Sequence, residues 1–185
     1  MSPLGRLLRN RRAGETHLAW NLPHLDGPES LTLTSWHFDD DGAIPLAHCA
    51  KHIGGEDLSP HLAWTQLPPG TAQLLLVVED IDVPMSKPAV HCLALIDPAA
   101  EHLEPGALGA KQPGPGVRVL RSTVGRGYHG PAPIKGHGPH RYVCQLFALE
   151  RPLDGNLDRA RPRALLSAVV PPVLGRGRLT GVFER

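Results

Sequence analysis

The stretch GRGYHGPAPIKGHGPHRY, residues 125–142, decides the fold prediction, because the apolar run VCQLFAL, residues 143–149, follows it directly. Five glycines and three prolines precede His140-Arg141-Tyr142. Glycine lets a backbone approach a ligand closely, and proline stiffens a loop that has no hydrogen bonds of its own. We therefore predict a long, stiff loop that ends in a histidine at the start of a strand, a place suited to a small polar pocket. A simple connector between two strands is the alternative.

The composition indicates a single domain without a strongly charged surface. The chain has 185 residues, enough to bury a core, and we treat residues 1–185 as one domain with an N-terminal extension, residues 1–30, before a core of residues 31–185. Lysine and arginine number 19 against 18 acidic residues, and a formal net charge of +1 gives no field that would attract nucleic acid. No apolar run has the length of a membrane span.

The cysteine and histidine patterns argue against a metal centre. Cys49, Cys92 and Cys144 are an odd number, lie far apart and form no C-x-x-C. This pattern favours reduced thiols in a cytoplasmic protein over a disulfide framework or a zinc site. The histidines show no zinc-ligand spacing, and H-E-x-x-H, G-x-S-x-G and G-x-x-x-x-G-K-[ST] are all absent from the sequence. We expect no metal, no cofactor and no hydrolase or nucleotide site.

Short apolar runs between glycine- and proline-rich turns predict a mainly β protein with mostly antiparallel sheet and few helices. Residues 31–38 (LTLTSWHF) alternate as a strand does, and residues 44–47 are interpreted as the returning strand of a hairpin. Residues 164–170 lie between Pro162 and Pro171, which predicts one helix near the C-terminus. Further strands are predicted at residues 74–79, 90–96, 117–120, 141–149 and 175–183.

The N-terminal stretch MSPLGRLLRNRR, residues 1–12, is basic and partly apolar. It lacks the uninterrupted apolar segment of a signal peptide. We interpret it as a terminal helix that is docked on the domain or frayed. A short amphipathic helix that touches an anionic membrane is the alternative.

Two carboxylates follow the strand predicted at residues 74–79. Asp80 and Asp82 point to the same side of an extended chain, so they can serve one site or repel each other. Alone, this D-x-D pattern is a weak signal, because acids at strand ends commonly form turns. His91 lies inside the next predicted strand, where a histidine is more often a hydrogen-bonded core residue than a ligand group.

Three segments together resemble one family. They are SPHLAW, residues 59–64, with the Pro-Gly turn after it, then Asp80-x-Asp82-x-Pro84 followed by His91, and the loop of residues 130–142. Their order and spacing are similar to those of the phosphatidylethanolamine-binding proteins, in the bacterial Raf-kinase-inhibitor-like branch. The resemblance covers about residues 31–149 and, more weakly, the chain to residue 183. It implies a β-sandwich of two antiparallel sheets with a few peripheral helices.

The resemblance also implies a small anion-binding pocket that accepts a phosphate, a phosphorylated headgroup such as phosphoethanolamine, or a carboxylate such as acetate. Members of the family are described as lipid-headgroup binders, modulators of kinases or proteases, and scaffold proteins, and bacterial members are often dimeric. We therefore expect a non-catalytic protein with a small anionic ligand, a protein partner and a homodimeric state. Carried over by position, the pocket residues are Asp80, Asp82, His91, Ala132, Pro133, His140 and Tyr142.

The residue types support an anion pocket without the family name. Two histidines can donate ring N–H bonds to oxygen, and an acid behind one of them fixes its tautomer. Amides of a glycine-rich loop add further donors. Because a bound anion favours the protonated imidazoles, binding should weaken as the pH rises above neutrality.

The chain departs from the family pattern around the pocket. Ile81 stands where a proline usually separates the two acids, and Val90 and Cys92 flank the strand histidine where an aromatic residue is usual. Ile134 replaces a second proline, and Phe183 replaces a tyrosine near the C-terminus. The pocket wall has lost aromatic surface and a hydroxyl, which leaves the identity of the ligand open.

Two other functions stay open. An enzyme would use Asp80, His91 and His140 for general acid–base chemistry, although no nucleophile accompanies them. An interaction protein would keep only a vestigial pocket. Retained anion binding separates the binding module from the interaction protein, and turnover of a bound compound separates the enzyme from both.

Overall fold

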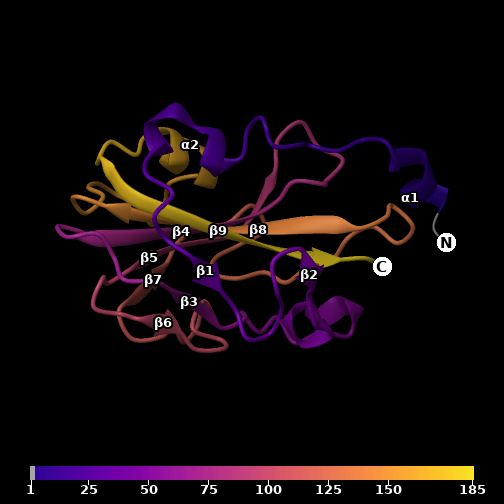
Figure 1. Cartoon of the computed structure of the whole chain (residues 1–185). Coiled ribbons are helices and arrows are strands. Elements are labelled where there is room, and N and C mark those ends of the chain that lie inside the picture. Colours follow the sequence, from indigo (N-terminus) through magenta and orange to yellow (C-terminus); the bar gives the residue numbers. More distant parts are fainter. Residues whose placement is uncertain (1–2) are drawn as a thin grey trace.

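The computed structural model describes residues 3–185 and is built around a six-stranded sheet with the order β2-β9-β8-β4-β5-β7 (Figure 1). All neighbours are antiparallel except β2, which runs parallel to β9. The first two residues of the basic N-terminal stretch lie outside the described residues. The strands are β2 (Gly42–Ala43), β4 (Gln73–Asp80), β5 (Ala89–Ile96), β7 (Val117–Val119), β8 (His140–Leu149) and β9 (Val173–Phe183).

A smaller sheet with the order β1-β3-β6 packs below the large one in Figure 1. Its strands are β1 (Leu33–Thr34), β3 (Leu62–Trp64) and β6 (His102–Leu103). The helical segments are short and peripheral: α1 (Pro3–Leu8), η1 (Ala19–Asn21), η2 (Pro23–Leu25), η3 (Leu46–His48), η4 (Lys51–Ile53) and α2 (Pro162–Ser167). The predicted fold class, two sheets with a few peripheral helices and one near the C-terminus, is confirmed.

Both faces of the large sheet are buried, as the continuous apolar runs predict. On β4, alternate residues such as Leu74 and Leu76 join the core beneath, which the small sheet covers. The residues between them, such as Leu75 and Val77, join a second core above the sheet. There η1, η2 and α2 cover the sheet (Figure 1). The strand predicted at residues 74–79 is therefore confirmed as one buried on both sides.

Close approach of the chain to β9 requires glycine in that strand. A Cβ added at Gly177 would lie 2.3 Å from the carbonyl oxygen of Leu31, so a side chain does not fit there. Leu31 in turn donates its N–H to the carbonyl of Arg176 at 3.1 Å, and Arg176 donates to Pro28 at 2.8 Å. The N-terminal extension is thus fastened along β9.

Two predicted elements differ from the structure. The strand predicted at residues 31–38 is limited to Leu33–Thr34, and the hairpin return predicted at residues 44–47 is wrong. Instead, Gly42–Ala43 pairs with the distant β9, and Pro45, which has no N–H to donate, precedes the 3₁₀ turn at Leu46–His48. None of the helices within residues 3–185 has the length and apolar character needed to cross a membrane.

Candidate functional site

The candidate site lies where β4 ends and β8 begins, at the end of the large sheet near α1 (Figure 1). Asp80 and Tyr142 are direct cross-strand partners there. The glycine- and proline-rich loop enters β8 at His140, as predicted. Pairing of the two strands therefore places Asp80, the first acid of the D-x-D pattern, beside the end of the glycine- and proline-rich loop.

A β-bulge delivers His91 to the same site. On β5, Cys92 pairs with Val78, but the next pair joins Val90 to Glu79, so His91 is left over in the register. Bulges re-aim side chains and recur beside functional sites. The extra residue lets the His91 ring face the lower core side together with Cys92, whereas Val90 joins the upper core.

His91 is partly buried and held in one orientation. Its Nδ1 lies 2.7 Å from the carbonyl oxygen of His129, and because a carbonyl only accepts, Nδ1 carries the hydrogen. Burial lowers the pKa of His91, whereas the hydrogen bond to His129 and the charge of Asp80 act in the opposite direction. The ring is thus biased toward the neutral form with Nε2 free to interact.

Tyr142 lies between the two predicted histidines. Its ring centroid is 5.2 Å from that of His91 and 6.4 Å from that of His140. The hydroxyl is buried and has no hydrogen-bond partner among the described residues. Burial and the nearby Asp80 carboxylate raise the pKa of Tyr142, so the hydroxyl keeps its proton and remains a donor.

A cavity of about 10 Å³ lies beside the His91 and Tyr142 side chains. That volume is about what one water needs, so the pocket is nearly closed. Among the predicted lip residues, Pro133 is buried and Ala132 partly exposed, and it is the neighbouring Pro131 that reaches the cavity wall. The cavity is lined by Phe38, Ile44, Pro60, Val78, His91, Tyr128, His129, Pro131, Tyr142 and Cys144.

His140 is engaged at both ring nitrogens. Nδ1 lies 2.7 Å from Asp80 Oδ2, and Nε2 lies 2.7 Å from Nδ1 of His137. All three side chains are fully buried. The structure therefore joins the predicted acid and histidine, but it covers the second histidine nitrogen with a residue of the loop.

Asp82 serves a different purpose from Asp80. Its carboxylate accepts bonds from the backbone and guanidinium of Arg141, at 2.8 to 2.9 Å, and forms an ion pair of 2.7 Å with Arg12. Burial alone would raise the pKa of Asp82, but the bonds from Arg141 and Arg12 outweigh it and lower the pKa to about 2. The second predicted acid thus fastens the start of β8 and the N-terminal segment.

His137 and Arg12 were not among the residues predicted for the site. His137 contacts the carbonyl oxygens of Leu8 and Arg11 at 2.8 and 3.2 Å, and Arg12 reaches Asp82. These partners are far apart in the chain, so no local pattern could identify them. The one available signal was the position of His137 three residues before His140, within the glycine-rich loop.

Larger hollows lie elsewhere on the surface. One of about 800 Å³ runs past Trp36, Trp64 and His102, and one of about 770 Å³ lies among the loops of residues 97–117. Within residues 3–185, no group of three or more histidine, cysteine or acidic side chains has a geometry that could hold a metal ion. Buried polar groups converge in the cluster of Asp80, His91, His140 and Tyr142.

Comparisons with known proteins agree with this architecture. The family model described as "Phosphatidylethanolamine-binding protein" matches residues 34–184. A UPF0098 protein of Methanothermobacter thermautotrophicus is 32% identical over 157 residues, which cover 84% of this chain and 99% of the relative. The UPF0098 protein YbhB of Escherichia coli is 32% identical over 126 residues, 65% of this chain and 78% of YbhB.

A solved structure also agrees with this architecture. The crystal structure of E. coli YbcL, described as a new member of the mammalian PEBP family, aligns with a TM-score of 0.71 and 27% sequence identity. The alignment covers 84% of this chain and 98% of YbcL.

Proposed function

Because the chain belongs to the phosphatidylethanolamine-binding protein family, we propose that it binds a small anion at the cavity between His91 and Tyr142. The ligand class is a phosphate, a phosphorylated headgroup or a carboxylate. The observation that carries the proposal is the buried Tyr142 hydroxyl, which has no partner among the described residues. A buried donor without a partner costs free energy, and an anionic oxygen in the cavity would satisfy it.

His91 is the second proposed donor. Its Nδ1–H is used by His129, so the ring offers a hydrogen to the cavity only when Nε2 is also protonated. A protonated ring carries a positive charge, which favours an anion over a neutral ligand. Tyr142 and His91 together therefore form a donor pair suited to one anionic oxygen or two neighbouring ones.

Entry of the anion requires the loop to move. The cavity of about 10 Å³ has room for about one water, and a phosphate is larger. The loop of residues 129–133 forms one wall, and the neighbouring Gly130 N–H is bound to Asp57 Oδ1 at 2.8 Å. We infer that the free protein is in a closed state and that the ligand selects a more open one.

We infer a binding role in preference to catalysis. Burial raises the pKa of Cys49 and of Cys144 to about 12, and it also raises the pKa of Cys92. The thiols near the cavity therefore stay protonated and are poor nucleophiles. Modulation of a kinase or protease, a homodimeric state and a cytoplasmic location are further proposals that rest on the family likeness alone.

Titration calorimetry with phosphate and with phosphoethanolamine, at about pH 6.5 where histidine titrates, tests the site. We expect wild-type binding, and Tyr142→Phe should weaken it by about tenfold or more, the size of a lost hydrogen bond to a charged group. The same variant should lose little stability, because the hydroxyl makes no hydrogen bond of normal geometry with a described residue, although the Asp80 carboxylate lies near it.

Tyr128→Phe is the matched control. Tyr128 also lines the cavity, but its hydroxyl donates to the His48 carbonyl at 2.9 Å. This variant should lose about 1 kcal/mol of stability and keep its affinity. Equal affinity in wild type and Tyr142→Phe, or no binding of either compound, would contradict the proposed function.

A further inference from the structure

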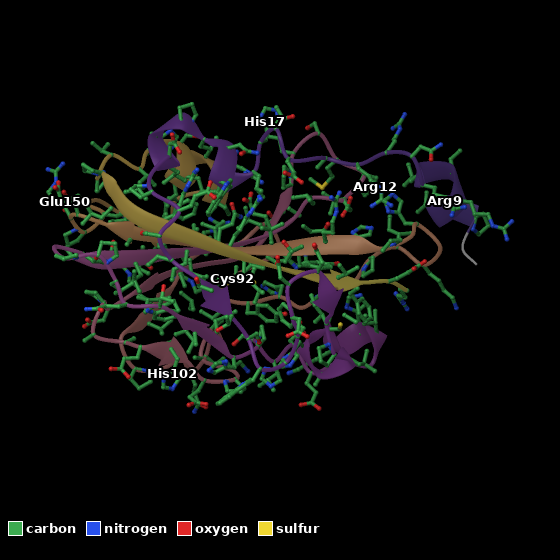
Figure 2. All side chains as sticks on the ribbon, in the orientation of Figure 1. Arg9, Arg12, His17, Cys92, His102 and Glu150 are labelled. Atoms are coloured by element: carbon green, nitrogen blue, oxygen red, sulfur yellow. The ribbon has the colours of Figure 1, made fainter. Side chains whose placement is uncertain are left out.

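The N-terminal segment, residues 3–14, lies at the end of the large sheet where β8 begins, and it contacts His137 and Asp82 there (Figure 1). Figure 2 shows Arg9 and Arg12 at the same end of the molecule as α1. Arg12 binds Asp82 at 2.7 Å and the carbonyl of Pro139 at 2.8 Å. Two backbone N–H groups also donate to the chain after β4, Ala13 to Val83 at 2.9 Å and Gly14 to Ile81 at 2.8 Å.

Residues 3–14, called the cover below, pack tightly on the loop that carries His137. Gly5 is buried, and a Cβ added to it would lie 2.3 Å from the carbonyl oxygen of Lys135. The His137 ring is completely buried between this segment and β8. It points one nitrogen at His140 and the other at the carbonyls of Leu8 and Arg11.

Counting hydrogens along this chain of contacts shows that it holds an extra proton. There are three links: Asp80 to His140 at 2.7 Å, His140 to His137 at 2.7 Å, and His137 to the Leu8 carbonyl at 2.8 Å. Each link needs one hydrogen. A carboxylate and two neutral imidazoles supply only two, one on each ring. Satisfying all three links therefore requires a third proton, wherever along the chain it resides.

The charges around these three side chains are compatible with an extra proton. The carboxylates of Asp82 and Glu15 are paired with the guanidinium groups of Arg12 and Arg141, so these four charges cancel. Burial biases His91 toward its neutral form. The third proton therefore supplies the positive charge that balances the carboxylate of Asp80. The neighbouring charged and titratable groups include Arg12 and Glu15 on the N-terminal segment, Asp82 after β4, His91 on β5, His129 in the loop before β8, and Arg141 and Tyr142 on β8.

We propose that His137 latches residues 8–12 over His140, beside the cavity, that the latch needs the third proton, and that an anion must displace His137 before it can use Nε2 of His140. This inference rests on the anion site proposed above. The N-terminal segment is then an intramolecular competitor of the ligand. Loss of the proton breaks one link and leaves the Asp80 charge unbalanced, so the cover loosens as the pH rises.

The proton count is tested directly on the unmodified protein. In NMR spectra of ¹⁵N-histidine and ¹³C-aspartate protein at about pH 7, near the ordinary histidine range, three hydrogens should be shared among the four ring nitrogens of His137 and His140 and the Asp80 carboxyl group. Two protonated nitrogens together with an ionised Asp80 carboxylate would overturn the proposal. This measurement does not depend on any variant folding.

Limited trypsin cleavage after Arg9 and Arg11 tests the latch itself. His137→Phe keeps the ring volume but removes both links, so cleavage should be about tenfold faster or more, as for the loss of a charge-assisted hydrogen bond. His52→Phe, at an exposed histidine away from the cover, should be cleaved at the wild-type rate. Equal rates for wild type and His137→Phe would overturn the latch.

Two further comparisons separate the parts of the proposal. From about pH 6 to pH 9, a range that spans histidine titration, the cleavage rate of wild type should approach that of His137→Phe, and a constant ratio would refute the proton requirement.

Added phosphate should speed cleavage of wild type and not of His137→Phe. Phosphate that binds by calorimetry without changing cleavage would refute the competition. If phosphate binds to neither protein, the anion site fails, and the cleavage ratio still decides whether the latch exists.

Discussion

The charge of His91 decides what the pocket can hold. The ring is held in place by its hydrogen bond to the His129 carbonyl. In the protein without ligand, burial keeps the pKa of His91 below the usual histidine value. An anion beside Nε2 would favour the charged ring and raise that pKa. Ligand binding and proton binding at this residue are therefore linked.

This linkage gives a pH dependence whose direction follows from the lowered pKa. Below that pKa the ring is already charged and binding takes up no proton; above it, each bound anion brings one proton, and the affinity falls as the pH rises. Calorimetry in two buffers of different ionisation enthalpy measures the uptake. His91→Gln keeps a neutral polar group and should take up about one proton fewer per bound anion than the wild type does above the pKa of His91. Equal proton uptake in the two proteins would exclude His91 as an anion ligand.

At the scale of the elements, Asp82 joins three pieces of chain. It fastens the end of β4 to the start of β8 through Arg141, and to the N-terminal segment through Arg12. The carboxylate is fully buried, so its hydrogen bonds are shielded from water. The geometry of the site depends on this clamp even though Asp82 does not line the cavity.

Acid should weaken the clamp. The pKa of Asp82 is about 2 in the folded protein. Because an unfolded aspartate titrates near 3.9, this carboxylate contributes about 2 to 3 kcal/mol of stability above about pH 4, and the contribution is lost as the pH falls toward 2. Urea unfolding at a series of pH values should show this loss in the wild type. Asp82→Asn should be less stable at neutral pH and show a smaller acid effect.

The exposed Asp154 provides the control, since Asp154→Asn should leave the acid profile unchanged. An Asp82→Asn protein that loses stability in acid as steeply as the wild type would show that another carboxylate is responsible.

The long strands could be predicted from the sequence, because a strand buried on both faces needs a continuous apolar run and β4, β5 and β8 each contain one. The short strands could not. β2 has two residues and is defined by its distant partner β9. The same limit applies to the site: the family motifs indicated Asp80, His91 and His140, but the bulge that orients His91 is a property of the register between two strands.

At the scale of the whole molecule, a buried ion pair connects the layers. Glu79, the next-to-last residue of β4, is paired with Arg163 of α2. Its other oxygen accepts bonds from the Ala19 N–H at 2.7 Å and from Gln145 at 2.9 Å. The carboxylate therefore links β4 and β8 to the N-terminal extension and to the C-terminal helix.

Removing the cation should leave Glu79 buried and uncompensated. Burial already raises the pKa of Glu79, against the effect of Arg163. We expect Arg163→Ala to cost about 3 to 5 kcal/mol of unfolding free energy, as for a broken buried pair. Adding Glu79→Gln should restore part of that loss. Denaturant unfolding measures both.

The exposed pair of Arg118 and Asp158 is the comparison, because both side chains are about half exposed. Arg118→Ala should cost less than about 1 kcal/mol. Similar losses for Arg118→Ala and Arg163→Ala would contradict the role assigned to Glu79.

The pairing of β2 with β9 constrains how the protein can be made. Residues 28–44 leave the ribosome well before the strand against which they pack, β9 (Val173–Phe183). Until it arrives, the long edge of β8 has no partner strand. Open strand edges of this kind invite pairing with other chains. Newly made chains should therefore depend on chaperones until β9 has closed the sheet.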